Sequence, residues 1–363
     1  MNAPSGTSTP AAPHSHAHHQ SFWLWVMCLT GVDYFSTLGY QPSIAYENAG
    51  LLAPLATLVL VAVTLFGALP IYSYVAQRSH AGHGSIGMLA KLVSGWWGKA
   101  LVLTLLGFAA TDFVITKTLS GADAAIHMIT NPHWPLDVPD DATKTRQAIL
   151  VTSFLLVLLG ASFMRGFREV IGLAVVIVGA YLALNVLVVG AGVKHLADHP
   201  HLFDQFLHRV QAGEWHLKEA PLSGTGIVTI LAISLLIFPK LALGLSGFET
   251  GVAVMPLVRG NPDDDPTEPK GRIRNARKLL ISAALVMSVF LTASSVVVAC
   301  LVPAEHLTKV DVHGHEHEEI PNATLKAKDR ALAYIAHGEN PDGKLLPFFG
   351  EWFGTIYDIS TVV

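Results

Sequence analysis

Two short polar stretches inside long apolar runs hold the residues best suited to chemistry. The first covers residues 30–43 and contains Asp33 together with Gly31, Gly39, Pro42 and several hydroxyl side chains. A carboxylate at membrane depth costs several kcal/mol, so it faces a protein interior or a wet cavity. Glycine and proline loosen a helix there, and freed backbone groups are tolerated only where they line a cavity. We therefore expect a helix break and a binding site at Asp33; the alternative is a polar interface between two packed helices.

The second stretch aligns oxygen atoms along one helix face. Asp112, Thr116 and Ser120 recur at i, i+4 and i+8, which places them on the same side of a helix. A carboxylate above two hydroxyls offers oxygen ligands to a desolvated cation or an ammonium group. Tyr40, seven residues after Asp33, would share the face of that acid in a continuous helix. The alternative is that the two hydroxyls bond to backbone carbonyls one turn back, as is common in membrane helices.

Two lysines and a third acid complete the polar set. Lys117 lies about 140° around the helix from Asp112 by the 3.6-residue period, and Lys240 stands inside a later apolar run. A lysine at membrane depth can carry a coupling proton, stand in for a bound cation or neutralise a buried acid, and these interpretations stay open. The run that holds Lys240 continues through a second glycine-rich polar segment, with Gly244, Ser246, Gly247 and Glu249.

Composition places these residues in a membrane. The chain has 363 residues, of which 51% are hydrophobic and only 14% charged, whereas soluble proteins usually carry about a quarter charged residues. Several runs reach the roughly 20 apolar residues that cross a bilayer. The net charge of −4 and the lack of a basic field give no indication of nucleic-acid binding. We expect an all-α polytopic membrane protein.

Hydropathy predicts seven spans and the beginning of an eighth. Residues 1–20 are rich in histidine and lack lysine and arginine, so we expect a disordered tail and no signal peptide. Lysine and arginine near the span ends place the short loops after spans two, four and six in the cytoplasm, with the N-terminus. Polar residues 193–222 and 303–344 are then external loops. The expected spans cover residues 22–50, 51–75, 99–129, 147–164, 169–192, 225–257 and 276–302, followed by 345–363.

Spans one and six are the interrupted ones, and they are five apart. Two inverted five-helix repeats produce such a pair, with the substrate at the interface of the two halves. Residues 21–192 would form the first repeat, and residues 223–302 would begin the second. Residues 30–33 (Thr-Gly-Val-Asp) and 246–249 (Ser-Gly-Phe-Glu) also echo each other. We expect the two breaks to face each other across a central cavity into which Asp33 and Asp112 point.

The polar stretches carry a family resemblance over about residues 22–303. Residues 33–40, 112–120 and 246–249, with Arg274-Asn275-Ala276-Arg277 after the next loop, resemble the amino acid–polyamine–organocation superfamily of permeases, nearest to the Kim/Kup-type potassium–proton symporters and related amino-acid permeases. The resemblance implies a leucine-transporter-like fold. It also implies a cation site, to which this chain would contribute Asp33, Tyr40, Asp112, Thr116, Ser120 and Ser246.

Three features depart from that resemblance. Lys117 stands inside the third-span motif where the potassium branch usually has an apolar residue, and Phe113 replaces a tyrosine, which removes one oxygen. The family fold needs at least ten helices, whereas this sequence ends inside the eighth span, residues 345–363. We therefore expect a truncated repeat in which the chain alone does not alternate.

The sequence thus predicts a secondary transporter in the cytoplasmic membrane, and no enzyme or cofactor. The substrate would be an amino acid or related amino solute coupled to protons or sodium, with potassium–proton symport as the alternative. A more distant alternative is a divalent-metal carrier or sensor that uses the histidine tail and His313, His315 and His317, although we expect no metal site near the acids. The expected partners are the substrate and the lipid bilayer, with a homodimer left open.

Overall fold

The computed structural model describes residues 20–363 except 165–166, 219–220, 223, 243–245, 266, 318–323 and 342. The chain is 75% helical, and the described residues form no strand. Five helical runs are long and apolar enough to cross a membrane, which defines an all-α membrane protein. They cover Thr37–Arg78, Gly95–Ile129, Asp141–Ser162, Ile171–Asp198 and Lys270–Leu301.

The first predicted span is two helices in succession. Helix α1 covers Trp23–Tyr34 and α2 covers Thr37–Ala49, and the turn between them lies within residues 30–43, as expected. The chain then reverses at the short helix η1, Gly50–Leu52. Gly50 has a φ of 52°, and a Cβ there would collide with the carbonyl oxygen of Trp215, so the close approach at this turn requires glycine.

The second span also changes geometry along its length. It comprises α3 (Ala53–Val63), a π-helical turn η2 (Thr64–Ala68) and α4 (Leu69–Arg78). Pro70 follows the wide turn, and its missing N–H removes one bond of the regular helical ladder. The short helix α5, Gly84–Leu92, then packs against α6 and occupies the glycine-rich linker.

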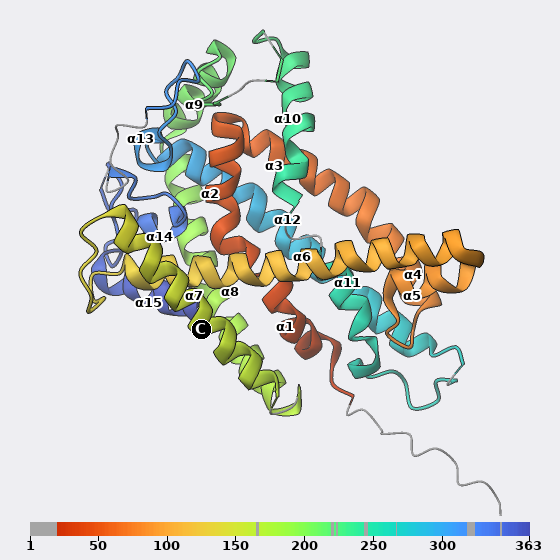
Figure 1. Ribbon diagram of the computed structural model, residues 1–363. Helices are drawn as coiled ribbons and strands as arrows, with labels where there is room; N and C mark the ends of the chain where they lie inside the picture. Colours follow the sequence, from red (N-terminus) through yellow and green to blue (C-terminus); the bar gives the residue numbers. More distant parts are fainter. Residues whose placement is uncertain are drawn as a thin grey trace, which may run out of the picture.

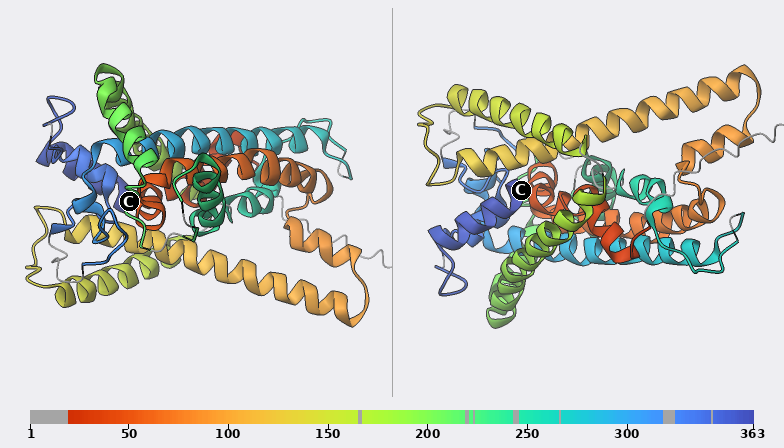
Figure 2. Two further views of the ribbon diagram at one scale, coloured as in Figure 1. Left: turned by 90° about the horizontal axis from the view of Figure 1, so that it is seen from above. Right: turned by 90° about the horizontal axis from the view of Figure 1, so that it is seen from below.

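Helices α6 (Gly95–Ile129) and α7 (Asp141–Phe163) form a hairpin along one side of the bundle (Figure 2). Asp140 begins α7, because its carboxylate accepts a hydrogen bond of 2.6 Å from the N–H of Thr143, which lowers the pKa of that carboxyl. Many large apolar side chains of this hairpin are exposed, as expected of surfaces that face lipid. Examples are Phe108, Val114, Phe154 and Val157.

The sixth predicted span is also discontinuous. Helix α10 covers Ile227–Leu241 and α11 covers Ser246–Ala253, followed by the short η4, Met255–Leu257. Helix α12, Lys270–Leu301, crosses the whole bundle (Figure 1). Two hydrophobic clusters meet along α12: one gathers around α1, α4 and α11, and the other around α2, α3 and α10.

The two segments expected to be external loops contain helices. Helix α8 (Phe167–Asp198) extends into the first of them and is followed by α9 (Pro200–Ala212), which buries Phe206 and Val210. The second contains α13 (Ala304–Leu307) and α14 (Ala331–Ala336). All six residues of α14 are buried against α2, α8 and α15. The description of residues 303–344 as a polar loop was therefore wrong at α14, because the polar residues on either side masked a short apolar run.

The last helix, α15, covers Glu351–Val362 and packs mainly on α6 and α14. In Figure 1, α14 and α15 lie beside the C-terminal end of α6. The expected span at residues 345–363 is therefore a helix of 12 residues.

Candidate functional site

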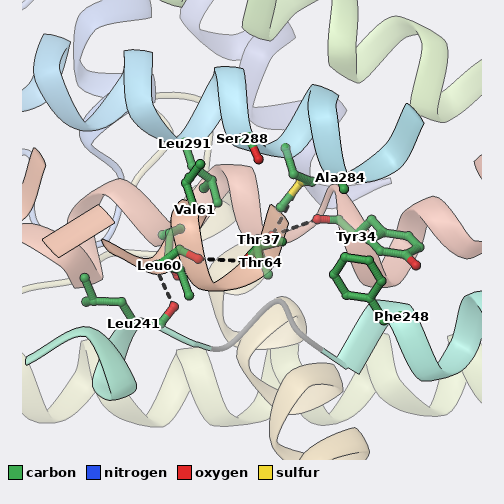
Figure 3. Close-up of a pocket in the computed structure, with 12 residues that line it drawn as sticks. Tyr34, Thr37, Leu60, Val61, Thr64, Leu241, Phe248, Ala284, Ser288 and Leu291 are labelled. Atoms are coloured by element: carbon green, nitrogen blue, oxygen red, sulfur yellow. Dashed lines mark hydrogen bonds between the residues drawn. The ribbon is translucent and has the colours of Figure 1, made fainter. Parts of the chain in front are cut away.

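The two interrupted helices meet at a small pocket of about 30 Å³ (Figure 3). Tyr34 and Thr37 flank the break in the first span, and Leu241 and Phe248 flank the break in the sixth. Ser288 of α12 lies on the opposite wall. Residues beside both breaks thus line one pocket, but neither Asp33 nor Asp112, which were expected to point into it, is among its lining residues.

A glutamine side chain joins the two breaks. Gln41 of α2 donates a hydrogen bond of 2.8 Å to the carbonyl oxygen of Leu241, the last residue of α10. This bond satisfies a carbonyl that the interrupted helix leaves without an intrahelical partner. The Oε1 atom of Gln41 and the Oγ atom of Ser288 are buried and have no hydrogen-bond partner among the described residues. Two side chains that line the pocket therefore carry an oxygen available to a ligand.

Asp33 is neutralised by a lysine from α6. Its side chain is nearly completely buried, Lys117 donates to Oδ1, and Thr250 of α11 donates to Oδ2. The side chain of Lys117 is 32% exposed. An acid from the first broken helix, a hydroxyl from the second and a lysine from the helix beside them thus form one centre. Of the interpretations left open for Lys117, the structure therefore matches the one in which it neutralises a buried acid, Asp33.

A second and larger cavity, of about 270 Å³, lies on the other side of the same break. Phe35 and Ser36 of the break, and Lys117, Ser120 and Asp123 of α6, are among its lining residues. Most of the remainder comes from α7, α8 and the end of α15. The Lys117 side chain therefore links the Asp33 centre to a space with room for several waters.

The glycines and proline expected to break the first helix lie inside helices. Gly31 belongs to α1, Gly39 and Pro42 belong to α2, and the turn falls at Phe35–Ser36. Gly39 permits close packing, since a Cβ there would lie 2.8 Å from Asp123 Oδ2. The expectation that these residues mark the break was wrong, because small residues also serve helix contacts.

Close packing also explains a glycine of α11. A Cβ on Gly247 would lie 2.6 Å from the ring of Tyr34, so the missing side chain lets α11 rest on α1. Glu249 accepts a hydrogen bond of 2.9 Å from the N–H of Ser85 in α5. This contact ties α11 to the α5 helix. Gly244 and the side chain of Ser246 lie outside the described part of the chain.

The expected oxygen ladder on α6 is only partly assembled. Ser120 donates a hydrogen bond of 2.9 Å to the carbonyl oxygen of Thr116, one turn back, which was the alternative interpretation of that hydroxyl. Thr116 is buried, while Asp112 is half-buried and forms no ion pair with a described residue. Tyr40 is buried, and its hydroxyl has no hydrogen-bond partner among the described residues. Of the predicted ladder, only Ser120 lines either cavity described above.

Lys240 is exposed at the C-terminal end of α10 and forms no ion pair with a described residue. Hydropathy places Lys240 at mid-span, which led to the expectation of a functional role. In the structure it lies next to the end of an interrupted helix.

The histidines of the loop contact one carboxylate, that of Asp311. Desolvation alone would raise the pKa of Asp311, but the N–H groups of His315, His317 and His313 outweigh it and hold the pKa well below its usual range. Among the described residues, no three His, Cys, Asp or Glu side chains could hold a metal ion together. The histidine tail, residues 1–19, lies outside the described residues.

Several polar residues at the site were not identified from the sequence. Gln41 and Thr250 belong to or adjoin the two polar segments, and Ser288 lies in the long apolar helix α12, but only the folded arrangement shows that they converge. Asp123 and His127 did leave a signal, because an acid and a histidine at i and i+4 in an apolar run share one helix face.

No family model matches the chain, and a search of curated proteins finds no significant match. The fold and the site therefore define its class on their own: an all-α membrane protein with two interrupted helices that meet at a buried polar centre.

Proposed function

We propose that the chain is a secondary transporter that binds a small amino solute, such as an amino acid, between its two interrupted helices. Alternating access driven by a proton or sodium gradient would move the solute, as in the permease superfamily that the sequence resembles. The observation that carries the proposal is the pocket between α1–α2 and α10–α11, beside a buried acid already neutralised by Lys117. Interrupted helices with this placement build the midplane sites of secondary transporters.

The charges around the pocket favour a zwitterion. Among the described residues, no charged side chain lines it. Helix α10 ends at Leu241, where the carbonyl end of a helix carries partial negative charge, and α11 begins at Ser246, where the N–H end carries partial positive charge. A solute with an ammonium group near α10 and a carboxylate near α11 would complement both ends. A bare cation would complement only one of them.

The size of the pocket implies a change of shape on binding. A volume of about 30 Å³ has room for only a few water molecules, so an amino acid requires the two breaks to separate. A solute can drive this separation only if it binds the open form more tightly than the closed one. Each transport cycle would therefore include opening at the Gln41–Leu241 contact.

A monovalent cation remains the second candidate, because the pocket is small and carries the free oxygens of Gln41 and Ser288. At Asp33, the paired Lys117 argues against a bare cation. At about 4 Å and an effective dielectric near 20, an ammonium group repels a cation by roughly 4 kcal/mol, which is about three decades of affinity. Potassium at Asp33 would have to displace this lysine or meet it uncharged.

Equilibrium binding to the purified chain tests the proposal. Labelled amino acids and rubidium are each titrated against the wild-type protein and Lys117→Ile, with Lys99→Ile as a control on an exposed lysine of the same helix. We expect an amino acid to bind the wild-type and control proteins and to bind Lys117→Ile weakly. Rubidium binding that appears only in Lys117→Ile would mean that the lysine excludes cations from a competent site. If neither probe binds any of the three proteins, the proposed function is wrong.

We propose further that the protein lies in the cytoplasmic membrane with its N-terminus inside and that α1–α8 form the first of two inverted repeats. Lysine and arginine in the short loops support the orientation. The five-span separation of the interrupted helices supports the repeat. Accessibility of single cysteines introduced near Arg78 and Asp137 to an impermeant thiol reagent tests the orientation, because the two are expected on opposite sides.

A further inference from the structure

A cluster of four titratable side chains lies buried at the C-terminal end of α6, away from the pocket between the breaks. Asp123 and His127 come from α6, Asp358 from α15, and His337 from the residue after α14. Each is more than nine-tenths buried. Charged groups are expensive to bury unless they are paired and hydrogen-bonded, so the placement of protons in this cluster matters.

Asp358 accepts hydrogen bonds from three side chains. His127 Nδ1 lies 2.7 Å from Oδ1, while His337 Nε2 and Asn131 Nδ2 lie 2.9 and 2.7 Å from Oδ2. Three donors favour the ionised form of this carboxyl. An ionised Asp358 in turn fixes the hydrogen of neutral His127 on Nδ1, since the hydrogen bond at one ring nitrogen decides the tautomer.

The second nitrogen of His127 then faces another acid. His127 Nε2 and Asp123 Oδ1 are 3.8 Å apart, and both atoms are buried without a hydrogen-bond partner among the described residues. If Nδ1 holds the hydrogen, neutral His127 presents a lone pair at Nε2, and an ionised Asp123 presents only lone pairs too. Neither can satisfy the other. One added proton, on either atom, supplies the donor that both lack.

We infer that Asp123 and His127 form a proton-binding site in which one proton is shared between Asp123 Oδ1 and His127 Nε2. The proton comes from water, leaves to water and alters no other bond. When it is bound, the pair closes from 3.8 Å to hydrogen-bond distance. When it is released, the pair holds one additional negative charge on Asp123.

The other groups packed around Asp123 and His127 are neutral or paired, so the shared proton is the one that is gained or lost. Helix α2 contributes Tyr40, α8 contributes Tyr181 and Asn185, and α15 contributes Tyr357, all neutral. Beyond Asp358, the segment around α14 supplies Asp329, Arg330 and Glu339. Arg330 donates to the carbonyl oxygen of Thr130 at 3.3 Å, and its other nitrogen lies 3.7 Å from Glu339. These two contacts hold Arg330 on the side of the cluster away from Asp123 and His127.

The site opens toward the Asp33 centre. Asp123, Ser120 and Lys117 of α6 line the same cavity of about 270 Å³, which has room for waters that can carry a proton. A negative charge on Asp123 attracts the Lys117 ammonium across this cavity and away from Asp33, and protonation removes that attraction. This step rests on the proposed function. If the solute binds beside Asp33, a change in the Lys117–Asp33 ion pair changes solute affinity, and the proton on Asp123 is then the coupling ion.

The proton site is tested without any solute by infrared difference spectroscopy of the purified chain over a pH series. We expect a protonated buried carboxyl band that disappears on raising the pH and that is lost in both Asp123→Asn and His127→Gln. Exposed His133→Gln and Asp137→Asn are controls that keep the band. Thermal unfolding of each variant shows that the protein is folded. A band that survives in folded Asp123→Asn, or no titrating band in the wild type, overturns the inference.

Coupling is tested by the pH dependence of solute binding. If a labelled amino acid or rubidium binds the wild type, we expect its affinity to vary over the pH range in which the band titrates. We expect that dependence to vanish in Asp123→Asn, because the effect of proton on solute and of solute on proton are equal. An unchanged dependence in that variant refutes coupling. If no solute binds, the proposed function fails while the infrared result still decides the proton site.

Discussion

Asp33 and Asp358 are both nearly completely buried, yet the chain neutralises them in different ways. Asp33 is held by Lys117 and Thr250, and the Lys117 side chain is about one-third exposed. Asp358 is held by two buried histidines and Asn131. A single long lysine can leave its partner and return, whereas three short donors on two segments, the end of α6 and the end of α14, cannot leave together without local unfolding. We infer that the Asp33 centre is the exchangeable one and that the Asp358 cluster is a fixed frame.

The largest expected effect is at Asp358. Asp358→Asn removes the charge and one of the acceptor oxygens, which leaves buried donors unsatisfied. We expect a loss of about 3 kcal/mol in the free energy of unfolding, since removing one member of a buried charged network costs this order. Thermal unfolding in detergent measures it against Asp204→Asn, an exposed acid on α9. Equal stability of the two variants would show that the cluster is not a structural frame.

A smaller loss is expected at Lys117. Lys117→Met leaves Asp33 buried without its cation, and we expect a loss of about 2 kcal/mol, below the value for fully buried pairs because water still reaches the lysine. Adding Asp33→Asn to the same protein should recover most of the loss, because the unpaired charge is removed. If the double variant is as unstable as the single one, the pair is not the cause. The same unfolding experiment decides between these results.

Gly39 lies where α2, which follows Asp33, packs against α6 near Asp123, so a substitution there tests the contact between the two regions. Gly39→Ala places a methyl group 2.8 Å from Asp123 and 3.2 Å from the Tyr181 hydroxyl, so α2 and α6 must separate. We expect a loss of about 1–2 kcal/mol, as for other overpacked sites. Gly107→Ala and Gly160→Ala are matched controls in membrane helices, because a Cβ at either meets nothing within 4 Å. A loss at Gly39 no larger than at the controls would contradict the close contact.

The smallest effect is expected at Lys240. Its side chain is exposed and makes no ion pair with a described residue, so Lys240→Ala should change the free energy of unfolding by less than about 0.5 kcal/mol. It should also leave solute affinity unchanged. A marked loss of affinity would place Lys240 in the solute site and revive its role as a coupling residue.

The sequence predicted the helix breaks better than the residues that cause them. Membrane-length runs, Asp33 and the five-span spacing were sufficient to place both interruptions, because an acid at membrane depth is costly and rare. The roles of Gly39 and Gly247 could not be predicted, since glycine serves a break and a close contact equally well. Only the position of Asp123 or Tyr34 opposite the missing side chain distinguishes them.

Contacts between residues far apart in the sequence were the other feature that the sequence could not predict. The 140° offset of Lys117 from Asp112 indicated that the lysine could point away from the expected ladder. It could not identify the partner of Lys117, because Asp33 lies 84 residues earlier in the chain. The Asp358 cluster joins α6 to α15 across 231 residues. Helical periodicity reports which residues share a face and carries no information about which helix packs against that face.

The most direct test of the central claim locks the small pocket between the breaks. Thr37 and Phe248 line it from opposite broken helices, so Thr37→Cys and Phe248→Cys are combined in a chain without Cys28 and Cys300, joined by a short bifunctional thiol reagent, and assayed for binding of labelled amino acids. The single-cysteine variants treated with the same reagent control for its bulk. We predict that the joined protein loses binding, which the singly labelled proteins keep. Undiminished binding by the joined protein would contradict a solute site between the two interrupted helices.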